Sequence, residues 1–474
     1  MSHLKTAVWL ATSACNLRCK HCYNSSAFQK KDELSTEEVK RLIIDELSKL
    51  KAESLTISGG EPLLRPDIIE IIKYAKSKNL KVHLLSNGTL LNEENVNQLK
   101  KYVDTVQISI EGLKNKHESI RGKGTFDKTI KGIKMLVKNK IYTILSNTPI
   151  GYDKNNLKDV INLAKKLKVQ EITFRKFVAL GRAKQNYQKE ASNKEKIDFL
   201  ETLMTYRKKE KSLKIGSGDP FFCFSYFLLQ GSDKKIIDTS NMLGGCGAGI
   251  AAIAIDSGGN IMPCTRLPYN LGNIKQTMLS NVWIKSKELK RLRDRSRLKG
   301  RCGKCKLKNL CGGCRAKAYL NNKDMFGEDP ECFLSTYKRI TAYKLMKEGE
   351  VSLKKGKLKQ GKEKMERGIS ILSETQVTDL DMLFIGLGYE KIRDFEKALL
   401  IYKALIRKIK AKDISLEYAL KAMISRALGR KNKNKELFLN AKALFEKASK
   451  HSHLFKEKWL IAAKECGKLG EKHG

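Results

Sequence analysis

The sequence predicts an α/β protein: a partial (β/α)6 barrel, then a small cysteine-rich domain, then an all-α tail of helical repeats. Three observations lead to this expectation. Short apolar segments alternate with helical segments as far as about residue 178. Cysteine and glycine then concentrate between about residues 241 and 336, and Lys/Glu-rich amphipathic helices follow. We therefore expect three domains, which cover residues 1–215, 216–340 and 341–474.

Six strand–helix units account for the first domain. The expected strands are AVWLA, SLTIS, KVHLLS, TVQIS, YTILSN and VQEITF, and the helices between them are expected over residues 36–51, 66–78, 92–101, 125–139 and 155–167. Strands that alternate with crossover helices run parallel, and six units are too few to close an eight-unit barrel. Polar segments follow three of the strands, namely SGGEP, SNG and SIEG. They should meet at the C-terminal edge of the sheet, where barrel enzymes carry their functional groups.

The other two domains have different signatures. After a helix expected over 193–210, the segment AAIAIDSGGNIMPC predicts a β-hairpin with its turn at Asp256–Gly259. In the tail, DMLFIGLGYEKIRDFEKALLIYKAL is similar to one tetratricopeptide repeat. Its small and aromatic packing positions fall at Gly386, Tyr389, Ala398 and Tyr402. Degenerate neighbours on both sides would complete a small solenoid, and an ordinary helical extension is the alternative.

The chain is strongly basic, with 94 Lys and Arg against 51 Asp and Glu and a formal net charge of +43. Lysines alternate with glutamates throughout, and no Arg-rich block or aromatic–basic motif stands out. We therefore expect solvated helix surfaces and no nucleic-acid partner, with a basic groove for an acidic peptide as the alternative. No apolar run approaches the roughly 18 residues of a membrane span. The apolar run at residues 7–11 is shorter than a signal-peptide core, so we expect a cytoplasmic location.

Twelve cysteines in such a chain indicate metal binding rather than disulfides. Three of them, Cys15, Cys19 and Cys22, occur in CNLRCKHC directly after the first expected strand. Thiolates are the usual ligands of iron–sulfur clusters, and three of them leave one iron of a cubane without a protein ligand. Zinc is the alternative, but it needs a fourth ligand nearby. His21 is adjacent to Cys22 and could not easily share a tetrahedral site with it.

The spacing of CNLRCKHC and the following SGGEPLL (residues 58–64) resembles the radical S-adenosylmethionine (SAM) superfamily. The resemblance covers about residues 1–215 and extends to LLSNGTLL and QISIEG…HESIRGKGTFD. It implies a 4Fe–4S cluster whose open iron is chelated by SAM. Electron transfer then cleaves SAM to a 5′-deoxyadenosyl radical, which abstracts a hydrogen atom from the substrate.

The resemblance also implies which residues contact SAM: His21, Gly59, Gly60, Glu61, Ser109 and Arg121. The two glycines would let the backbone approach the methionyl amino group, and the glutamate would supply a charge-matched end to that loop. The histidine would lie near the adenine, and the serine near the ribose or the methionyl part. The arginine would face the carboxylate. For the serine and the arginine alone, strand packing and surface charge are the alternatives.

A second group of cysteines resembles the SPASM extension of radical SAM enzymes, which holds two auxiliary 4Fe–4S clusters. Its members are Cys246, Cys264, Cys302, Cys305, Cys311, Cys314 and Cys332. The resemblance implies that Cys246, Cys264 and Cys314 bind the first auxiliary cluster and the other four bind the second. Two residues separate Cys311 and Cys314, where a gap of three residues is commoner in the family. The alternative for this group of cysteines is a pair of structural zinc sites. Cys223 is either a fourth ligand of the first auxiliary cluster or a core thiol, and Cys466 is expected to pack in a helix.

The resemblance implies an enzyme that modifies a peptide or protein by thioether formation, epimerisation or C–C cross-linking. Thr265 stands where the sulfatase-maturing branch carries an aspartate, which disfavours that branch. A modifier of a haem precursor or other small cofactor is the alternative enzyme, and an iron–sulfur adaptor with a peptide-binding tail is the alternative of another class. A low-potential electron donor such as ferredoxin or flavodoxin is an expected partner. We assign the catalytic role to the radical and leave Tyr142 and Tyr269 open as assisting residues.

Overall fold

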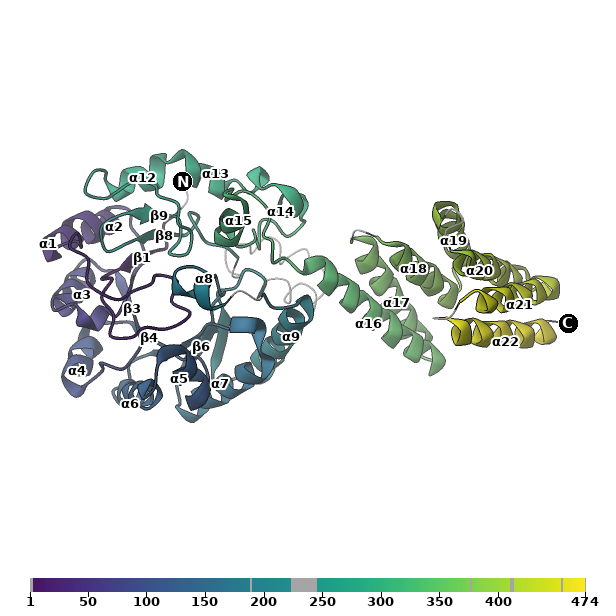
Figure 1. Cartoon of the computed structure of the whole chain (residues 1–474), viewed down its shortest axis with the longest axis horizontal. Coiled ribbons are helices and arrows are strands. Elements are labelled where there is room, and N and C mark those ends of the chain that lie inside the picture. Colours follow the sequence, from purple (N-terminus) through teal and green to yellow (C-terminus); the bar gives the residue numbers. More distant parts are fainter. Residues whose placement is uncertain are drawn as a thin grey trace. The chain divides into compact units, whose positions relative to one another are not determined.

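A computed structural model describes residues 3–187, 190–222, 245–375, 377–409, 413–452 and 455–473 of the protein. The chain forms two compact units, Met1–Cys332 and Phe333–Gly474 (Figure 1). Cys223, which we expect to be either a cluster ligand or a core thiol, lies outside the described residues. Among the helices of the described ranges, none combines the length and the apolar character that crossing a membrane requires.

A nine-stranded sheet in the described residues forms the centre of the first unit. Its barrel strands are β1 (Thr6–Leu10), β2 (Ser54–Ser58), β3 (Lys81–Ser86), β4 (Thr105–Ser109), β5 (Thr143–Asn147), β6 (Glu171–Phe174) and β7 (Lys214–Ser217). They pair in sequence order, and every pair is parallel. The six predicted strands are therefore confirmed. The seventh, KIGS, has a single large apolar residue and gave no strand pattern in the sequence.

Crossover helices cover the outside of the curved sheet (Figure 1). They are α1 (Thr36–Glu38), η1 (Val39–Ile44) and α2 (Asp45–Lys49), which follow one another without a break, then α3 (Ile68–Ser77), α4 (Glu93–Tyr102), α6 (Thr125–Lys138), α7 (Lys154–Lys166) and α9 (Asn193–Lys209). Apart from the three-residue α1, each buries apolar side chains; on α6 these include Ile133 and Leu136. Two short polar helices, α5 (Lys114–Arg121) and α8 (Arg182–Asn186), were not predicted.

The parallel pairing brings the ends of several strands to one edge of the sheet. Ser58, Ser86 and Ser109 are the last residues of β2, β3 and β4. The strand interiors are buried apolar side chains such as Ile57 and Leu84, as expected for a sheet covered on both faces. Along these strands, the polar side chains that can form a site therefore lie at the C-terminal edge of the sheet.

The cysteine-rich region continues the barrel sheet. Strand β8 (Ala252–Ile255) pairs in parallel with β1, with Thr6 opposite Ala252, and β9 (Ile261–Met262) pairs antiparallel to β8. The predicted hairpin is confirmed, and its turn uses Gly259 at a φ of +90°. Its membership in the barrel sheet was not predicted. The helices of this region are α12 (Leu279–Lys285), α13 (Lys287–Arg293), α14 (Gly300–Lys304) and α15 (Arg315–Asn322).

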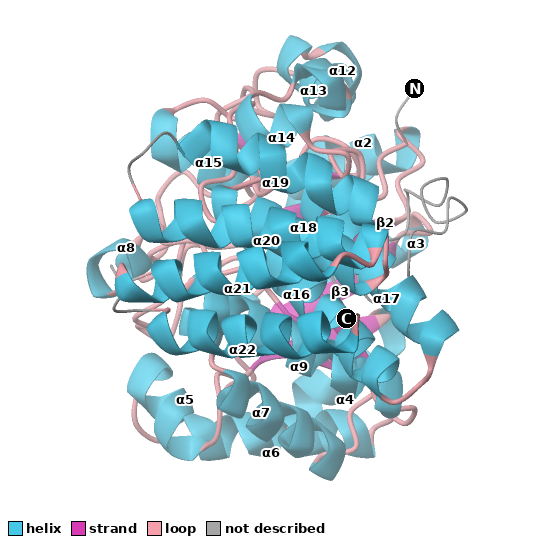
Figure 2. Ribbon diagram, turned by 90° about the vertical axis from the view of Figure 1, so that its right-hand side faces the viewer, coloured by secondary structure: helices cyan, strands magenta, loops and turns pink. Residues whose placement is uncertain are grey.

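The second unit consists of packed helices (Figure 2). Its helices are α16 (Leu334–Lys354), α17 (Leu358–Ser373), α18 (Asp379–Lys391), α19 (Phe395–Ile409), α20 (Ile414–Asn432), α21 (Lys435–Lys450) and α22 (Lys456–Lys472). Each packs against the next along the chain. At the centre of the predicted repeat, a β-carbon on Gly386 would lie 2.4 Å from the Tyr402 ring, so only glycine fits. The expected small-against-aromatic packing is therefore present.

Candidate metal centres

The first group of cysteines lies on the loop that leaves β1 at the C-terminal edge of the sheet. The Cys15 amide donates to the Ala27 carbonyl at 3.1 Å, and the Cys22 amide donates to the Cys19 carbonyl at 3.2 Å. Cys19 is buried, whereas Cys15 and Cys22 are half-buried. The pKa of the Cys15 thiol is raised to about 11, mainly by burial and further by the Glu61 carboxylate and the thiols of Cys19 and Cys22. The three thiols therefore face one shared space.

These thiols do not form a site for a single ion. Within the described ranges, no group of three or more His, Cys, Asp or Glu side chains is gathered closely enough to hold one metal ion. A cluster makes a different demand, because each of its thiolates binds a different iron. The spacing of the cysteines is thus compatible with a cluster.

The loop after β2 is pressed against the backbone of the cysteine loop. The Gly60 amide donates to the Thr12 carbonyl at 2.7 Å, and the Glu61 amide donates to the Ala14 carbonyl at 2.8 Å. A β-carbon on Gly60 would lie 1.9 Å from the Ala14 carbonyl oxygen. Gly59 has a φ of +123°, and a β-carbon there would lie 2.6 Å from the Thr12 carbonyl oxygen. In the structure, the glycines thus allow close contact with the cysteine loop. Their expected approach to the methionyl amino group stays a prediction.

Glu61 joins this loop to the end of β3. Its Oε1 accepts from the Ser86 hydroxyl at 2.8 Å, and its Oε2 accepts from the Asn87 amide at 2.8 Å. The side chain is fully buried, and burial raises the pKa of its carboxyl despite these hydrogen bonds. Glu61 therefore fixes the relative positions of two strand ends, a role that the sequence did not reveal.

His21 and Arg121 meet at a carboxylate that the sequence analysis missed. Glu111 follows β4, and its Oε1 lies 3.0 Å from His21 Nε2 and 2.6 Å from Arg121 Nη2. Burial opposes ionisation of Glu111, but the charges of His21 and Arg121 outweigh it and hold its pKa well below the ordinary range. Arg121 Nη1 lies 3.8 Å from the sulfur of Cys19. The only sequence signal was the acidic residue of SIEG at a strand end.

The arrangement around His21 fits a bound nucleoside. Its Nε2 is fixed by Glu111, while its Nδ1 is buried and has no hydrogen-bond partner in the described part of the chain. A buried polar atom of this kind needs a partner, and adenine nitrogens or ribose hydroxyls supply one. Ser109 ends β4 two residues before Glu111 and is half-buried. Contacts of His21, Ser109 and Arg121 with SAM stay predictions.

The cysteines expected at the first auxiliary cluster are brought together. Cys246 contributes to the raised pKa values of the Cys264 and Cys314 thiols, in both cases after the dominant effect of burial. The Cys314 amide donates to the carboxylate of the fully buried Asp329 at 2.7 Å. The three expected ligands thus face one another across the base of the hairpin.

Two buried arginines lie close to cysteines of both auxiliary groups. Arg295 is affected electrostatically by Cys246, Cys311 and Cys302, although burial is the main cause of its lowered pKa. Its Nε and Nη1 are buried and have no hydrogen-bond partner among the described residues. Arg315, which is completely buried, points Nη2 at the Cys302 sulfur at 3.6 Å. Anionic clusters would satisfy both guanidinium groups, so these residues fit the expected cofactors.

The remaining members of this set lie around α14. The Cys305 amide donates to the Cys302 carbonyl at 3.4 Å, and the Cys332 amide donates to the Asp329 carbonyl at 3.2 Å. The pKa of Arg301 is raised, first by its hydrogen bond to Glu328 and then also by the nearby thiols of Cys332 and Cys302. Cys466 is fully buried in the core of the second unit, as expected.

The two tyrosines considered as assisting residues, Tyr142 and Tyr269, have contacts that do not indicate a catalytic role. Tyr142 precedes β5 at the N-terminal edge of the sheet, away from the cysteines, and its hydroxyl lies 3.4 Å from Glu171. Tyr269 packs edge-on against Tyr319 at a ring distance of 5.9 Å.

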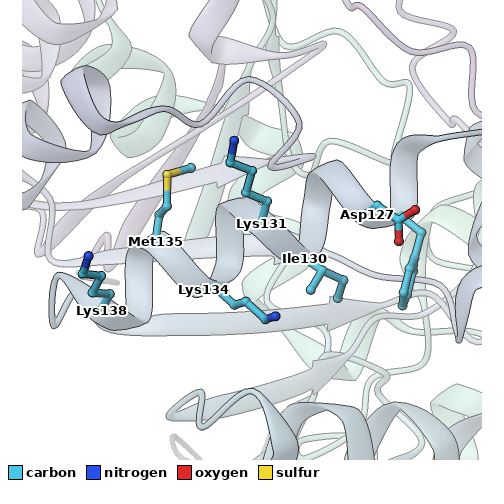
Figure 3. Close-up of a pocket in the computed structure, with 7 residues that line it drawn as sticks. Asp127, Ile130, Lys131, Lys134, Met135 and Lys138 are labelled. Carbon is cyan, nitrogen blue, oxygen red and sulfur yellow. The ribbon is translucent and has the colours of Figure 1, made fainter.

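A separate hollow lies along α6 (Figure 3). It is lined by Phe126, Asp127, Ile130, Lys131, Lys134, Met135 and Lys138, all from this one helix. It contains none of the residues expected to hold a cofactor.

Comparison with known proteins identifies two domains in the first unit. Residues 9–167 match the radical SAM superfamily, and residues 246–314 match the iron–sulfur cluster-binding SPASM domain. An AdoMet-dependent heme synthase of Methanosarcina barkeri is 33% identical over 339 residues, which cover 68% of this chain and 95% of that protein. A mycofactocin maturase of Mycobacterium tuberculosis is 29% identical over 338 residues and is covered to 81% of its length.

Solved structures share the fold. SuiB of Streptococcus suis, bound to S-adenosylmethionine, superposes with a TM-score of 0.58 at 19% identity, over 70% of this chain and 77% of that one. The enzyme anSMEcpe with bound AdoMet gives a TM-score of 0.56 at 20% identity, over 72% of this chain and 97% of that one. The chain therefore belongs to the radical SAM superfamily, as an enzyme with a SPASM domain that uses 4Fe–4S clusters and SAM.

Proposed function

We propose that the protein cleaves SAM reductively and abstracts a hydrogen atom from a peptide or protein substrate. One observation carries the first half of this proposal: the thiols of Cys15, Cys19 and Cys22 face a shared space beside the His21–Glu111–Arg121 group. The cluster and SAM, when bound, supply the 5′-deoxyadenosyl radical.

The chain's own residues hold and shield these groups. The SAM-binding cluster would be held by Cys15, Cys19 and Cys22. Backbone hydrogen bonds from the Gly59–Glu61 loop stabilise the loop that carries these cysteines. Glu111 fixes the ring orientation of His21, so the free Nδ1 is presented in one direction. Arg121 carries positive charge beside Cys19, which compensates the negative charge of a thiolate-bound cluster.

The second unit supports a peptide or protein substrate. Seven successive helices pack pairwise there within the described ranges, and stacked helix pairs of this kind form extended binding surfaces for polypeptides. About a third of this chain lies outside the match to the heme synthase. A polypeptide-binding role explains why the chain carries the additional unit.

A haem precursor is the second candidate substrate. The Methanosarcina barkeri heme synthase shares 33% identity over nearly its whole length. A pre-heme d1 synthase of Dinoroseobacter shibae is 29% identical and is covered to 87% of its length. The similarity of the first unit to these proteins favours a tetrapyrrole.

SAM cleavage is tested by anaerobic reconstitution of the full chain with iron and sulfide, followed by SAM and dithionite. We expect 5′-deoxyadenosine by mass spectrometry, and none above background for Cys15→Ala. Cys466→Ala, which removes a thiol from the second unit, is the matched control and should retain the product. Equal amounts from Cys15→Ala and the parent chain would refute the proposal.

The substrate class is tested with deuterated candidates. Peptides encoded beside this chain's reading frame and iron coproporphyrin III are offered in parallel, each deuterated at its abstractable positions. Transfer of deuterium into 5′-deoxyadenosine identifies the class that gives up the hydrogen atom. Transfer from the tetrapyrrole alone would replace the peptide proposal by the second candidate.

We further infer that an acidic electron donor of the ferredoxin or flavodoxin type docks on the cysteine loop. The cluster-loop patch is defined by the exposed Phe28 and the exposed cations of the cysteine loop and the segment after it, namely Arg18, Lys20, Lys30 and Lys31. In the described part of the chain, none of these four cations has a carboxylate within ion-pair distance. Phe28 is 79% exposed with Arg18 stacked on its ring, and Arg18 Nη1 donates to the Cys15 carbonyl at 2.6 Å. A basic patch beside the cluster ligands complements an acidic partner.

The donor proposal is tested by the ratio of flavodoxin-driven to dithionite-driven SAM cleavage. Lys30→Glu/Lys31→Glu should lower this ratio roughly tenfold at low salt. Lys131→Glu/Lys134→Glu, on the outer face of α6, changes the same charge and should leave the ratio unchanged. An equal effect of both pairs would contradict docking at the patch.

Such donors, and the free state of every cysteine in the described ranges, favour a reducing compartment such as the cytoplasm.

A further inference from the structure

Two arginines at the mouth of the barrel have no acidic partner. Arg175 directly follows β6, and its Nη2 donates to the Gln107 side chain of β4 at 3.0 Å. Arg266 comes two residues after Cys264, and its Nη1 donates to the Lys176 carbonyl at 2.9 Å. Both side chains are half-buried. Within the described ranges, neither guanidinium has a carboxylate within ion-pair distance.

Their neighbour Lys176 shows the usual solution for a buried cation. Its Nζ lies 2.7 Å from Glu331, and the side chain is almost completely buried. In the described residues, Arg175 has the neutral Gln107 amide as its side-chain hydrogen-bond partner and faces the positive charge of Arg266, while Glu171 acts on it more weakly and from beyond ion-pair distance. Its pKa is lowered to about 10, first by burial and then by the charge of Arg266. Two like charges in a partly desolvated space are unfavourable unless an anion lies between them.

The arginine pair lies where the two cysteine groups approach each other. Tyr23 follows Cys22, and its hydroxyl is hydrogen-bonded to the Thr265 side chain. Thr265 lies between Cys264 and Arg266 in the sequence, so this hydrogen bond joins the loop of the first cysteine group to the segment that carries Arg266. Arg266 is therefore close to the loop of the SAM-binding cluster as well as to the first auxiliary group. Gln107 points into the same space from β4.

We propose that Arg175 and Arg266 bind a carboxylate group of the substrate and hold the substrate between the two cysteine groups. This inference rests on the proposed function, because it concerns the molecule that meets the radical. A guanidinium offers parallel N–H donors that match the two oxygens of a carboxylate, so two of them can fix both its position and its plane. The same chemistry is offered by a tetrapyrrole propionate and by a glutamate, aspartate or C-terminus of a peptide.

Two competing uses of the pair make different predictions. If the pair bound the methionyl carboxylate of SAM, loss of Arg175 would weaken SAM binding and spare the substrate. If it compensated the first auxiliary cluster, loss of Arg175 would lower the iron content. No cysteine thiol is among the groups that shift the pKa of Arg175, whereas Arg266 acts electrostatically on the Cys264 thiol. Arg175→Gln is therefore the variant that separates the two uses, and Arg295 and Arg315 already lie beside other auxiliary cysteines.

Binding is measured on the reconstituted full chain without SAM or reductant, so the result does not depend on turnover. One arm titrates iron coproporphyrin III and its methyl ester by the Soret absorbance. The other titrates, by fluorescence anisotropy, a labelled peptide that contains glutamates and has a free C-terminal carboxylate, and its counterpart with glutamines and an amidated C-terminus. We expect one of the two free acids to bind, and Arg175→Gln and Arg266→Gln each to weaken it roughly tenfold or more. The arm that responds identifies the source of the carboxylate.

The controls isolate the geometry of the pair. Arg175→Lys keeps the charge but loses the bidentate contact, so it should bind more tightly than Arg175→Gln and less tightly than the parent chain. Lys131→Gln/Lys134→Gln removes two charges on the outer face of α6 and should leave the affinity unchanged (Figure 3). Circular dichroism and iron content verify that each variant is folded and loaded.

Several outcomes would overturn the inference. These are no binding of either free acid, equal affinity for the acid and its ester or amide, an equal loss in the Lys131/Lys134 control, a loss of SAM affinity instead, or iron loss in the Arg175 variants. Failure of the proposed function is recognised separately, as absence of 5′-deoxyadenosine from the parent chain. Carboxylate binding without that product would leave the site in place and remove the radical reaction.

Discussion

The two units treat buried charge in opposite ways. In the second unit, Glu390 accepts two hydrogen bonds from Arg426, one from Arg430 and one from the Tyr402 hydroxyl. In the first unit, buried nitrogens of His21 and Arg295 have no partner within the described ranges. The second unit thus pairs its buried carboxylate with its own side chains, although the buried Trp459 Nε1 has no partner in the described part of the chain. In the first unit, the unpaired nitrogens of His21 and Arg295 lie where bound cofactors would satisfy them.

This difference distinguishes buried polar groups that stabilise the fold from buried polar groups that are available to bind a ligand. A saturated buried ion pair contributes to the uniqueness of a fold, whereas an unsaturated one costs free energy until a ligand arrives. The unpaired nitrogens of His21 and Arg295 lie beside the cysteines, and Arg175 follows a strand end, where cofactors and substrate are expected. Removing either the ligands or the internal pairs should therefore affect one unit and spare the other.

The largest expected effect is that of removing the clusters. In anaerobic calorimetry, iron-free protein should unfold its first unit at least about 10 °C below the reconstituted protein, because ligands that bind only the folded state stabilise it. The transition of the second unit should shift by less than about 2 °C. Equal shifts of both transitions would contradict the proposed independence.

Glu390→Gln should destabilise the second unit by about 3–5 kcal/mol, because Arg426 would keep a buried charge without a counter-ion and the half-buried Arg430 would lose its partner. Urea unfolding of the second transition measures this, with iron content unchanged. Glu396→Gln is the matched control: its ion pair with Lys431 is exposed and should contribute less than about 0.5 kcal/mol. A similar loss in both variants would mean that burial is irrelevant here.

Acid should weaken the first unit through His117. This side chain is fully buried, and its pKa is lowered to about 4, first by burial and then by Arg121. Below an ordinary pKa of about 6.5 the unfolded chain binds a proton that the folded chain does not. The unfolding free energy should therefore fall by about 3 kcal/mol in total as the pH drops from about 6.5 to about 4.

Urea unfolding of the first transition at several pH values tests this. His117→Gln should flatten the dependence, whereas His3→Gln, with an exposed imidazole, should retain it. An unchanged slope in His117→Gln would assign the acid sensitivity to other groups.

The smallest expected effect concerns the auxiliary potential. Arg295→Gln removes a buried positive charge between Cys246, Cys302 and Cys311, which disfavours the more negative reduced cluster. The midpoint potential should fall on the order of 100 mV in a titration followed by electron paramagnetic resonance. Arg297→Gln removes an exposed arginine two residues away and should change it little. An unshifted potential in Arg295→Gln would place the arginine away from the cluster.

The sequence predicted the barrel because its strands are buried on both faces and its helices have clear apolar stripes. It predicted the groups of cysteines because their spacing is specific. It missed β7 and α5, which are short and polar, so the surrounding fold determines their conformation rather than their own pattern. It also missed Glu111, Arg175 and Arg295. Each is a single charged residue whose role depends on contacts that form only in the folded protein. The spacing of residues in the sequence does not reveal such contacts.

The pairing of β8 with β1 also bears on how the protein is made. Thr6 and Ala252 are neighbours in the sheet, so β1 cannot complete its pairing until most of the first unit has been synthesised. Until then one edge of β1 stays open, and open strand edges favour aggregation. Changes that keep the cysteine-rich region from folding should therefore promote aggregation of the whole chain, because this edge of β1 would stay open.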